Sequence, residues 1–277
     1  MIWATLAFAR PCPGPVPFQP GVLSLPDRSE YRVAFSPEGD TVWFHVDTGD
    51  GLTVWTASRR GRGWTEPVVA PFSGRWRDAD PFVSPDGRSV YFSSYRPVKG
   101  DTPRPDADVW VVHRDGDGWG APIHLGPEVN TERDELYASV TASGTLYWGS
   151  DSDEGAGGWD VWRAERAGVD SFAPRENVAA VNTELWEFNP WVSADESRLL
   201  FVGLRHPDGL GMGDVYTSVR ADGQWQAPRN LGPGLNTAGD DFHPMLGPRH
   251  QLVFVRQVWE PLAPSELFVV DARCLGL

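Results

Sequence analysis

The stretch Asp78-Ala-Asp-Pro-Phe-Val-Ser-Pro-Asp-Gly-Arg-Ser-Val-Tyr-Phe92 decides the fold of this chain. It predicts a short apolar strand, a tight Ser-Pro-Asp-Gly turn and a second apolar strand. The Asp-Gly pair is typical of a β-hairpin turn, because glycine adopts positive φ at little cost. The stretch therefore predicts a β-hairpin, and weaker copies of it recur along the chain.

Five copies of this hairpin are found. The counterparts of Ser84 are Ser36, Thr141, Ser193 and Gly247, so neighbouring copies lie about 48 to 57 residues apart. This spacing is in the range of a propeller blade. Each second strand is a continuous apolar run, as in Val90-Tyr91-Phe92, which suits a strand buried on both faces. The repetition indicates blades that bury one another's faces.

Further elements recur after each hairpin. A third strand carries an aromatic residue, as in Asp108-Val109-Trp110, and an aromatic-x-x-Pro signature follows, as in Trp119-Gly-Ala-Pro122. A short outer strand then leads into an Asn-Thr pair at Asn130-Thr131, Asn182-Thr183 and Asn236-Thr237. The predicted fold class is all-β: a five-bladed β-propeller of four-stranded antiparallel blades.

The last copy ends at 271–277 without an outer strand, whereas residues 21–26 resemble an outer strand with no blade of their own. We therefore expect an N-terminal strand to complete the last blade and close the ring, which removes exposed sheet edges. We expect residues 1–20 to be an apolar, proline-rich arm or a signal remnant, and 21–277 to form one propeller domain. The repeats span about 30–77, 78–130, 131–182, 183–236, and 237–277 together with 21–26.

Charge and composition exclude several functions. The net charge is −14, which argues against sequence-independent binding to nucleic acid or to an anionic membrane. No apolar run reaches the roughly 18 residues of a membrane span. Residues 1–9 are apolar and end in Ala7-Phe8-Ala9, which matches a secretory cleavage pattern but lacks a basic start. They are interpreted as either a truncated signal or an apolar arm.

The chain has two cysteines, Cys12 and Cys274, one near each end. In a closed ring whose ends meet, the two can form a disulfide, whereas in a cytosolic protein two free thiols are the usual state. We predict the disulfide. It favours a periplasmic or extracellular location, with a cytoplasmic one as the alternative.

The Pro-x-x-Ser-Pro-Asp-Gly core of Pro81–Gly87 resembles the TolB-type repeat of bacterial β-propellers, also called the periplasmic WD-like repeat. The Asp-Val-Trp, Trp-x-x-Pro and Leu-Gly…Asn-Thr elements are similar to those of envelope-associated propellers. This resemblance covers nearly all of the chain after about residue 20 and implies a binding module. The later turns depart from the pattern: Thr-Ala-Ser-Gly in copy three, no turn glycine in copy four and Gly-Pro-Arg-His in copy five.

An acidic residue lies six positions before each reference residue. These five acids, the acidic ring, are Glu30, Asp78, Glu135, Glu187 and Asp241. They could hold a channel Ca²⁺ or act as glycosidase carboxylates. The third interpretation is that each one accepts hydrogen bonds at an interblade turn. We predict this structural role, because catalytic carboxylates need unequal environments and a position repeated in every blade indicates architecture.

The position two residues later varies between blades. These residues, the axial column, are Arg32, Asp80, Tyr137, Asn189 and His243. A mixed polar set at equivalent positions suits an asymmetric ligand site, so we predict ligand binding here, at the channel mouth. The alternative is five solvated channel positions.

No Gly-x-Ser-x-Gly elbow, His-Glu-x-x-His motif or phosphate-binding loop is present, and no catalytic residue is assigned. We predict a non-catalytic binding or scaffolding propeller of the cell envelope. It would engage an envelope protein or a glycan through its channel mouth and variable loops. The alternative is a polysaccharide-active hydrolase or lyase with carboxylates in the channel. No cofactor or metal is predicted, apart from the alternative of a channel Ca²⁺.

Overall fold

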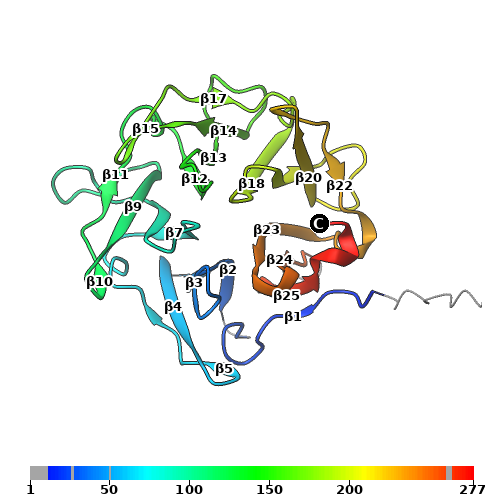
Figure 1. Ribbon diagram of the computed structural model, residues 1–277, viewed down its shortest axis with the longest axis horizontal. Coiled ribbons are helices and arrows are strands. Elements are labelled where there is room, and N and C mark those ends of the chain that lie inside the picture. Colours follow the sequence, from blue (N-terminus) through cyan, green and yellow to red (C-terminus); the bar gives the residue numbers. More distant parts are fainter. Residues whose placement is uncertain (1–11, 26–27, 50, 260–263) are drawn as a thin grey trace, which may run out of the picture.

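The computed structural model describes residues 12–25, 28–49, 51–259 and 264–277, so the apolar segment 1–9 lies outside the described residues. Five antiparallel sheets stand around a central axis, which confirms the predicted five-bladed propeller (Figure 1). In blades 1 to 5 the inner strands are β2 (Ser29–Phe35), β7 (Asp78–Val83), β12 (Glu135–Val140), β18 (Trp186–Val192) and β23 (Asp240–Gly247). The second strands are β3 (Thr41–Asp47), β8 (Ser89–Ser94), β13 (Leu146–Ser150), β19 (Arg198–Leu204) and β24 (Gln251–Gln257). The third strands are β4 (Leu52–Arg60), β9 (Asp108–Asp115), β14 (Asp160–Ala164), β20 (Gly213–Ala221) and β25 (Glu266–Asp271).

The outer edges are built from two-residue strands. In blades 1, 2 and 4 the third strand pairs with two of these short strands. They are β5 (Gly63–Trp64) and β6 (Val68–Val69) in blade 1, β10 (Gly118–Trp119) and β11 (Ile123–His124) in blade 2, and β21 (Gln224–Trp225) and β22 (Arg229–Asn230) in blade 4. Blade 3 differs, because only β17 (Glu176–Asn177) pairs with its third strand. Its other outer segment forms a separate hairpin of β15 (Arg166–Gly168) and β16 (Ser171–Phe172).

An N-terminal strand closes the ring, but earlier in the chain than predicted. β1 (Val16–Pro17) pairs antiparallel with β25, and the Phe18 N–H donates to the Leu267 carbonyl at 2.7 Å. Residues 21–25 instead form a turn, in which the Gln19 carbonyl accepts from Val22, Leu23 and Ser24. The turn buries Leu23 completely against apolar side chains of blades 1 and 5. The prediction of 21–26 as the closing strand was therefore wrong in position.

The seam of the ring is also covalent in the structure. Cys274 lies in the 3-10 helix η3 (Ala272–Leu275), directly after β25, and is joined to Cys12 with a Cα–Cα distance of 5.6 Å. The bond links residues 262 positions apart. It thus ties together the two segments that complete the fifth blade.

We predict that titration of the unreduced, denatured protein finds no free thiol. Reduction, or the paired change Cys12→Ser with Cys274→Ser, should lower the free energy of unfolding by about 4 to 5 kcal/mol, because the bond removes the closure entropy of a very long loop. Denaturant titration with and without reductant measures this, and the double serine variant serves as the reductant-insensitive control. Two free thiols in the unreduced protein would contradict the prediction.

The repeated asparagines brace the third strands beyond the ends of the short outer strands. In blades 2, 3 and 4 the asparagine Oδ1 accepts from a backbone N–H, and its Nδ2 donates to the carbonyl of the same residue, at 2.7–3.1 Å. The pairs are Asn130 with Val109, Asn182 with Val161 and Asn236 with Val215. The asparagine side chain thus gives the third-strand N–H an acceptor and gives its carbonyl a second donor, beside the backbone N–H that this carbonyl also accepts.

We predict that Asn182→Ala lowers the free energy of unfolding by about 1 to 3 kcal/mol, because it leaves a buried N–H and carbonyl of Val161 without their side-chain partner. Denaturant unfolding measures the change. The exposed Glu132→Ala provides a surface control. An Asn182→Ala variant as stable as that control would show that the brace contributes nothing.

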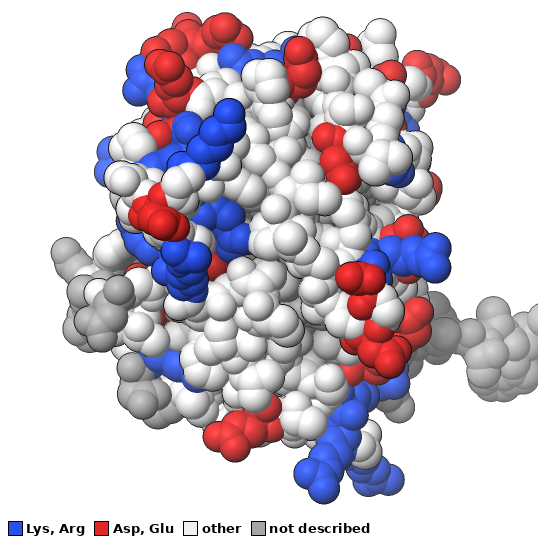
Figure 2. Space-filling view, turned by 90° about the vertical axis from the view of Figure 1, so that its left-hand side faces the viewer, with Lys and Arg blue, Asp and Glu red and all other residues white. Residues whose placement is uncertain are grey.

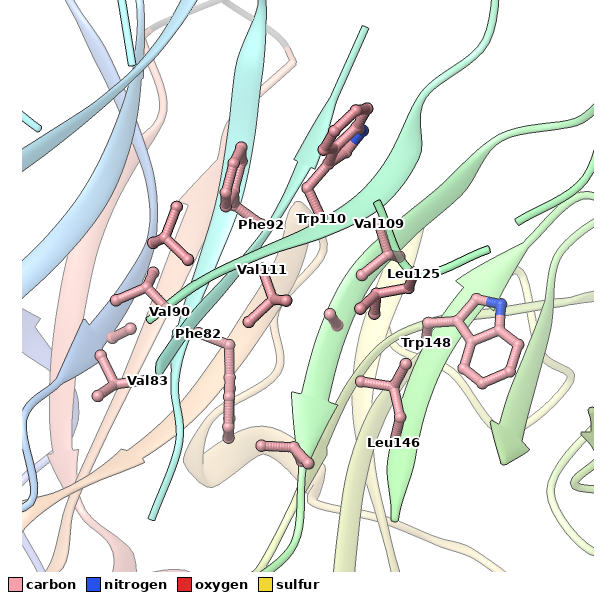
Figure 3. Packing of buried hydrophobic residues seen from close by; sticks show 14 of the residues in the cluster. Phe82, Val83, Val90, Phe92, Val109, Trp110, Val111, Leu125, Leu146 and Trp148 are labelled. Carbon is pink, nitrogen blue, oxygen red and sulfur yellow. The ribbon is translucent and has the colours of Figure 1, made fainter. Parts of the chain in front are cut away.

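Apolar side chains fill the space between blades. In Figure 3 Phe92, Trp110 and Val109 of blade 2 lie in the upper half of the view, and Leu146 and Trp148 of blade 3 lie at the lower right. All five belong to one buried cluster, and Trp148 is fully buried. The aromatic residues of the repeat therefore act mainly in packing between blades.

The hairpin turns form even where the later copies depart from the Ser-Pro-Asp-Gly turn sequence. Gly39, Gly87 and Gly144 have φ between +70° and +93°, whereas Glu196 reaches the same region at +58° in copy four. The Glu196 carboxylate accepts from the Tyr147 hydroxyl at 2.6 Å and pairs with Arg220. These contacts hold a non-glycine residue in a conformation that costs roughly 1 kcal/mol or more.

The surface agrees with the charge analysis. On the face in Figure 2 several basic side chains gather on the left of the view with acidic side chains among them, and uncharged residues cover the centre. In the part of the chain that the structure describes, no helix is long and apolar enough to cross a membrane.

Candidate functional site

Every inner strand is broken by a bulge at the same place. The register against the second strand shifts between Tyr31 and Ala34 in blade 1, and at the equivalent residues of the other four blades. Two residues of the inner strand then lie opposite one residue of its neighbour. The first residue of each bulge is a member of the axial column.

All five column residues have positive φ. The values are +43° for Arg32, +54° for Asp80, +64° for Tyr137, +54° for Asn189 and +51° for His243. Non-glycine residues adopt this region rarely, and such strain persists only where the surrounding structure enforces it. In blades 2, 4 and 5 the next residue is a proline, which a bulge tolerates because no ladder N–H is needed there.

The bulges turn the column side chains toward one another inside the channel. Arg32 and Asn189 are fully buried, Asp80 and His243 are nearly so, and Tyr137 is half-buried. The column therefore lies inside the channel. The sequence-based prediction had placed it at an exposed channel mouth. The column is also not a set of solvated positions.

Arg32 links three blades. Its Nη2 donates to the carbonyls of Ala138 at 2.7 Å and of Tyr137 and Pro190 at 3.2 Å. Burial lowers the pKa of its guanidinium to about 10, and the nearby Asp80 opposes that effect. Arg32 consequently remains charged at neutral pH while bridging blade 1 to blades 3 and 4.

Asp80 is the only carboxylate of the column and lies between two imidazoles. Its Oδ1 is 3.5 Å from His45 Nδ1 and 3.8 Å from His243 Nδ1, and its backbone N–H donates to His45 Nδ1 at 3.1 Å. Burial raises the pKa of the Asp80 carboxyl to about 7, against the opposing effect of Arg32. Burial, reinforced by Arg32, lowers the pKa of His45 to about 3. Both histidines are therefore neutral near pH 7, because burial also lowers the pKa of His243.

His45 belongs to this centre, although the repeated positions in the sequence do not indicate it. It comes from the second strand β3 and stacks on Tyr31 at 4.9 Å between ring centroids. The available signal was its position in β3 directly opposite Tyr31, the residue before the bulge.

The centre retains hydrogen-bonding capacity. Within it, five buried polar atoms of the described side chains have no protein hydrogen-bond partner: Asp80 Oδ1, Arg32 Nε and Nη1, His243 Nδ1 and Asn189 Nδ2. Donors and an acceptor thus converge from four blades.

An aromatic wall lies directly before the column. The residues that precede the bulges in blades 1, 4 and 5 are Tyr31, Phe188 and Phe242, all half-buried. They line a cavity of about 260 Å³ with the exposed Trp259, whose Nε1 donates to Asp240 Oδ2 at 2.7 Å. We call this the mouth cavity. An aromatic residue at the same repeat position in three copies was the sequence signal for it, and the prediction missed it.

The acidic ring is buried in local hydrogen bonds. All five side chains are fully buried. In blades 3, 4 and 5 the acid accepts from the N–H and the hydroxyl of the threonine four residues earlier, at 2.6–2.8 Å. These pairs are Glu135 with Thr131, Glu187 with Thr183 and Asp241 with Thr237.

The other two ring acids use different donors for the same purpose. Asp78 accepts from the hydroxyls of Ser73 and Ser94 and pairs with Arg96 at 2.7 Å. Glu30 accepts from the Leu25 N–H at 3.2 Å and also pairs with Arg28. The whole ring thus fastens the start of each inner strand to the turn or the neighbouring strand. The five settings differ in detail, because Glu187 also contacts His206 at 2.6 Å, Asp241 also pairs with Arg256, and burial raises the pKa of Glu135 to about 7. All five acids nevertheless have local hydrogen-bond partners, which fits an architectural role.

We predict a pH-dependent stability difference between Asp80→Asn and the wild type. Between about pH 4 and pH 7 the unfolded Asp80 is ionised, while the folded carboxyl retains its proton, because its pKa is raised to about 7. The wild type therefore loses stability relative to the variant as pH rises through this window. Thermal unfolding of both proteins at each pH measures the difference.

Asp195→Asn serves as the control. Hydroxyl hydrogen bonds from Ser193 and Ser197 lower the pKa of Asp195 to about 2, so its carboxyl is ionised throughout that window. Its stability difference from the wild type should stay constant from pH 4 to pH 7. A constant difference for Asp80→Asn as well would show that Asp80 is ionised in the folded protein.

No family model matches the chain, and neither does any curated protein. Among solved structures, the RGII complex of BT0996 aligns with a TM-score of 0.64 and 10% identity, covering 94% of this chain and 91% of that one. TolB from Acinetobacter baumannii aligns with a TM-score of 0.54 and 11% identity, covering 88% of this chain and 54% of that one, so this chain spans about half of its length. The GH43 endo-arabinanase from Bacillus licheniformis aligns with a TM-score of 0.56 and 12% identity, covering 90% and 96%. These likenesses support a TolB-type propeller fold.

Proposed function

We propose that this protein is a binding propeller of the cell envelope that engages a glycan or a protein segment at the mouth cavity, and that its channel is non-catalytic. The observation that carries the proposal is the contrast between the two sets of polar residues. The acidic ring is occupied by local donors, and the column offers a single carboxylate, Asp80, enclosed by Arg32 and two imidazoles. Glycoside hydrolysis ordinarily needs a pair of carboxyl groups flanking the scissile bond.

The mouth cavity supplies the binding surface. Tyr31, Phe188, Phe242 and Trp259 present aromatic faces beside the polar Asp240, Gln257 and Ser265. Aromatic rings bury large areas with little loss of side-chain freedom, and Trp259 already has its N–H bonded. A cavity of about 260 Å³ suits one sugar ring or one large side chain at the end of a longer ligand.

The location in the envelope rests on two observations. The Cys12–Cys274 bond in the structure supports an oxidising compartment, since disulfides persist outside the cytosol. The TolB-type repeat at Pro81–Gly87 points to the periplasm by resemblance.

A polysaccharide hydrolase is the second candidate. Two observations favour it: the pKa of Asp80 is raised to about 7, as a general acid requires, and the fold is similar to that of an endo-arabinanase. Under this alternative Asp80→Asn would abolish turnover.

The experiment compares binding and hydrolysis on the same glycan panel. We expect measurable binding without release of sugar, and about a 10-fold or greater loss of affinity for Phe242→Ala, because truncating a buried aromatic contact costs more than 1 kcal/mol. Val68→Ala on the outer strand β6 is the matched control and should bind like the wild type.

Hydrolysis that disappears in Asp80→Asn would replace this proposal with the enzymatic one. Capture of an envelope protein that Phe242→Ala fails to retain would assign the mouth cavity to a protein ligand. Binding of both classes that is insensitive to Phe242→Ala would refute the mouth cavity as the site.

A further inference from the structure

A second cavity lies away from the channel, between blades 2 and 3. Its volume is about 430 Å³, and its lining comes from the β7–β8 hairpin, from β9, from the end of β12 and the turn that follows it, and from the β15–β16 hairpin. Three of its lining residues are Ser89, His113 and Asp170. None of them contributes to the acidic ring, the axial column or the mouth cavity.

These three side chains form a continuous hydrogen-bonded chain. Ser89 Oγ is 2.8 Å from His113 Nδ1, and His113 Nε2 is 2.8 Å from Asp170 Oδ1. One neutral tautomer satisfies both contacts, in which Nε2–H donates to Asp170 and Nδ1 accepts the Ser89 hydroxyl proton. The His113 side chain is 36% exposed, so the imidazole is accessible from the cavity.

The chain of contacts is not part of the repeat. Ser89 and His113 are cross-strand partners in β8 and β9. The equivalent pairs in blades 1, 4 and 5 contain no imidazole, and they are Thr41 with Ser58, Arg198 with Val219 and Gln251 with Asp271. A polar arrangement confined to one blade is not required by the architecture.

Asp170 reaches His113 from a different blade. It lies at the tip of the β15–β16 hairpin, which pairs separately from the rest of blade 3. Its φ is +53°, so the backbone holds a strained conformation at the residue that meets the imidazole. The β15–β16 hairpin at the outer edge of blade 3 thus places Asp170 beside His113.

We infer that Ser89, His113 and Asp170 form an acyl-transfer site that hydrolyses small carboxylic esters. Ser89 Oγ attacks the ester carbonyl carbon while its proton moves to His113 Nδ1, and the carbonyl π electrons move to oxygen. The tetrahedral intermediate expels the alcohol oxygen, which takes the proton from His113. Water then attacks the acyl-Ser89 through His113, which releases the carboxylic acid and restores the serine hydroxyl. The hydrogen bond to Asp170 holds the tautomer that this sequence requires, which makes Asp170 a positioning residue.

The remaining lining suits such a substrate. Arg166 and Arg88 place positive charge in the same cavity, and a cation there stabilises the developing oxyanion. Val140, Val169 and Phe172 provide an apolar wall for a short acyl chain. Val169 is 81% exposed at the entrance, where an acyl group would cover it.

The test uses p-nitrophenyl acetate and butyrate, together with a fluorophosphonate probe followed by mass spectrometry. We expect hydrolysis by the full chain and a phosphonyl adduct on Ser89. Ser89→Ala should abolish the adduct and reduce kcat/KM at least ~100-fold, and His113→Gln should reduce it by a similar factor. Asp170→Asn should lower kcat at unchanged KM, which separates positioning of the imidazole from substrate binding.

Thr41→Ala is the matched control, because Thr41 occupies the position of Ser89 in blade 1 and pairs with a serine instead of a histidine. It should leave hydrolysis and labelling at Ser89 unchanged. Thermal unfolding of each variant verifies that it folds. The fluorophosphonate adduct tests Ser89 in the wild type itself, so this measurement does not depend on the folding of any variant. Absence of both hydrolysis and a Ser89 adduct would overturn the inference, and so would hydrolysis that persists in Ser89→Ala. Either result leaves binding at the mouth cavity untouched.

Discussion

Five inner strands stand around one axis, and the side chains that they turn toward it must fit into the space that they enclose. The structure meets this constraint with a bulge in every blade, at which one residue takes positive φ and turns its side chain inward. The strain is balanced by the ring of buried acids, which fastens the start of each strand, and by Arg32, which ties three blades together. The closed channel, the mouth cavity above it and the unusual environment of Asp80 all follow from this geometry.

Repetition and variation have different physical meanings in this molecule. Positions that repeat, such as the asparagines of blades 2, 3 and 4, satisfy buried backbone groups in the same way in several blades. Positions that vary meet no such requirement and are free to form sites. The axial column and the Ser89–His113–Asp170 set are both of the second kind, and each combines side chains from more than one blade with a strained backbone.

The fold could be predicted because hairpin chemistry is local and repeated five times. The closing strand was predicted at 21–26 but lies at 16–17. Both segments carry a valine with a proline or glycine nearby, and only the turn around Gln19 distinguishes them. The column residues were identified, but their burial was not, because a bulge in an inner strand has no glycine to mark it here. His45 and Asp170 come from other strands or other blades, so no spacing in the sequence relates them to their partners.

The axis is closed around one carboxyl group, that of Asp80, whose environment disfavours its charge. Carbon-13 NMR of the Asp80 side chain, followed through a pH titration of the folded protein, tests it most directly. We expect a protonated carboxyl at pH 5 that ionises near pH 7, because burial outweighs the attraction of Arg32. A carboxylate already fully ionised at pH 5 would contradict it and would mean that water reaches the axis.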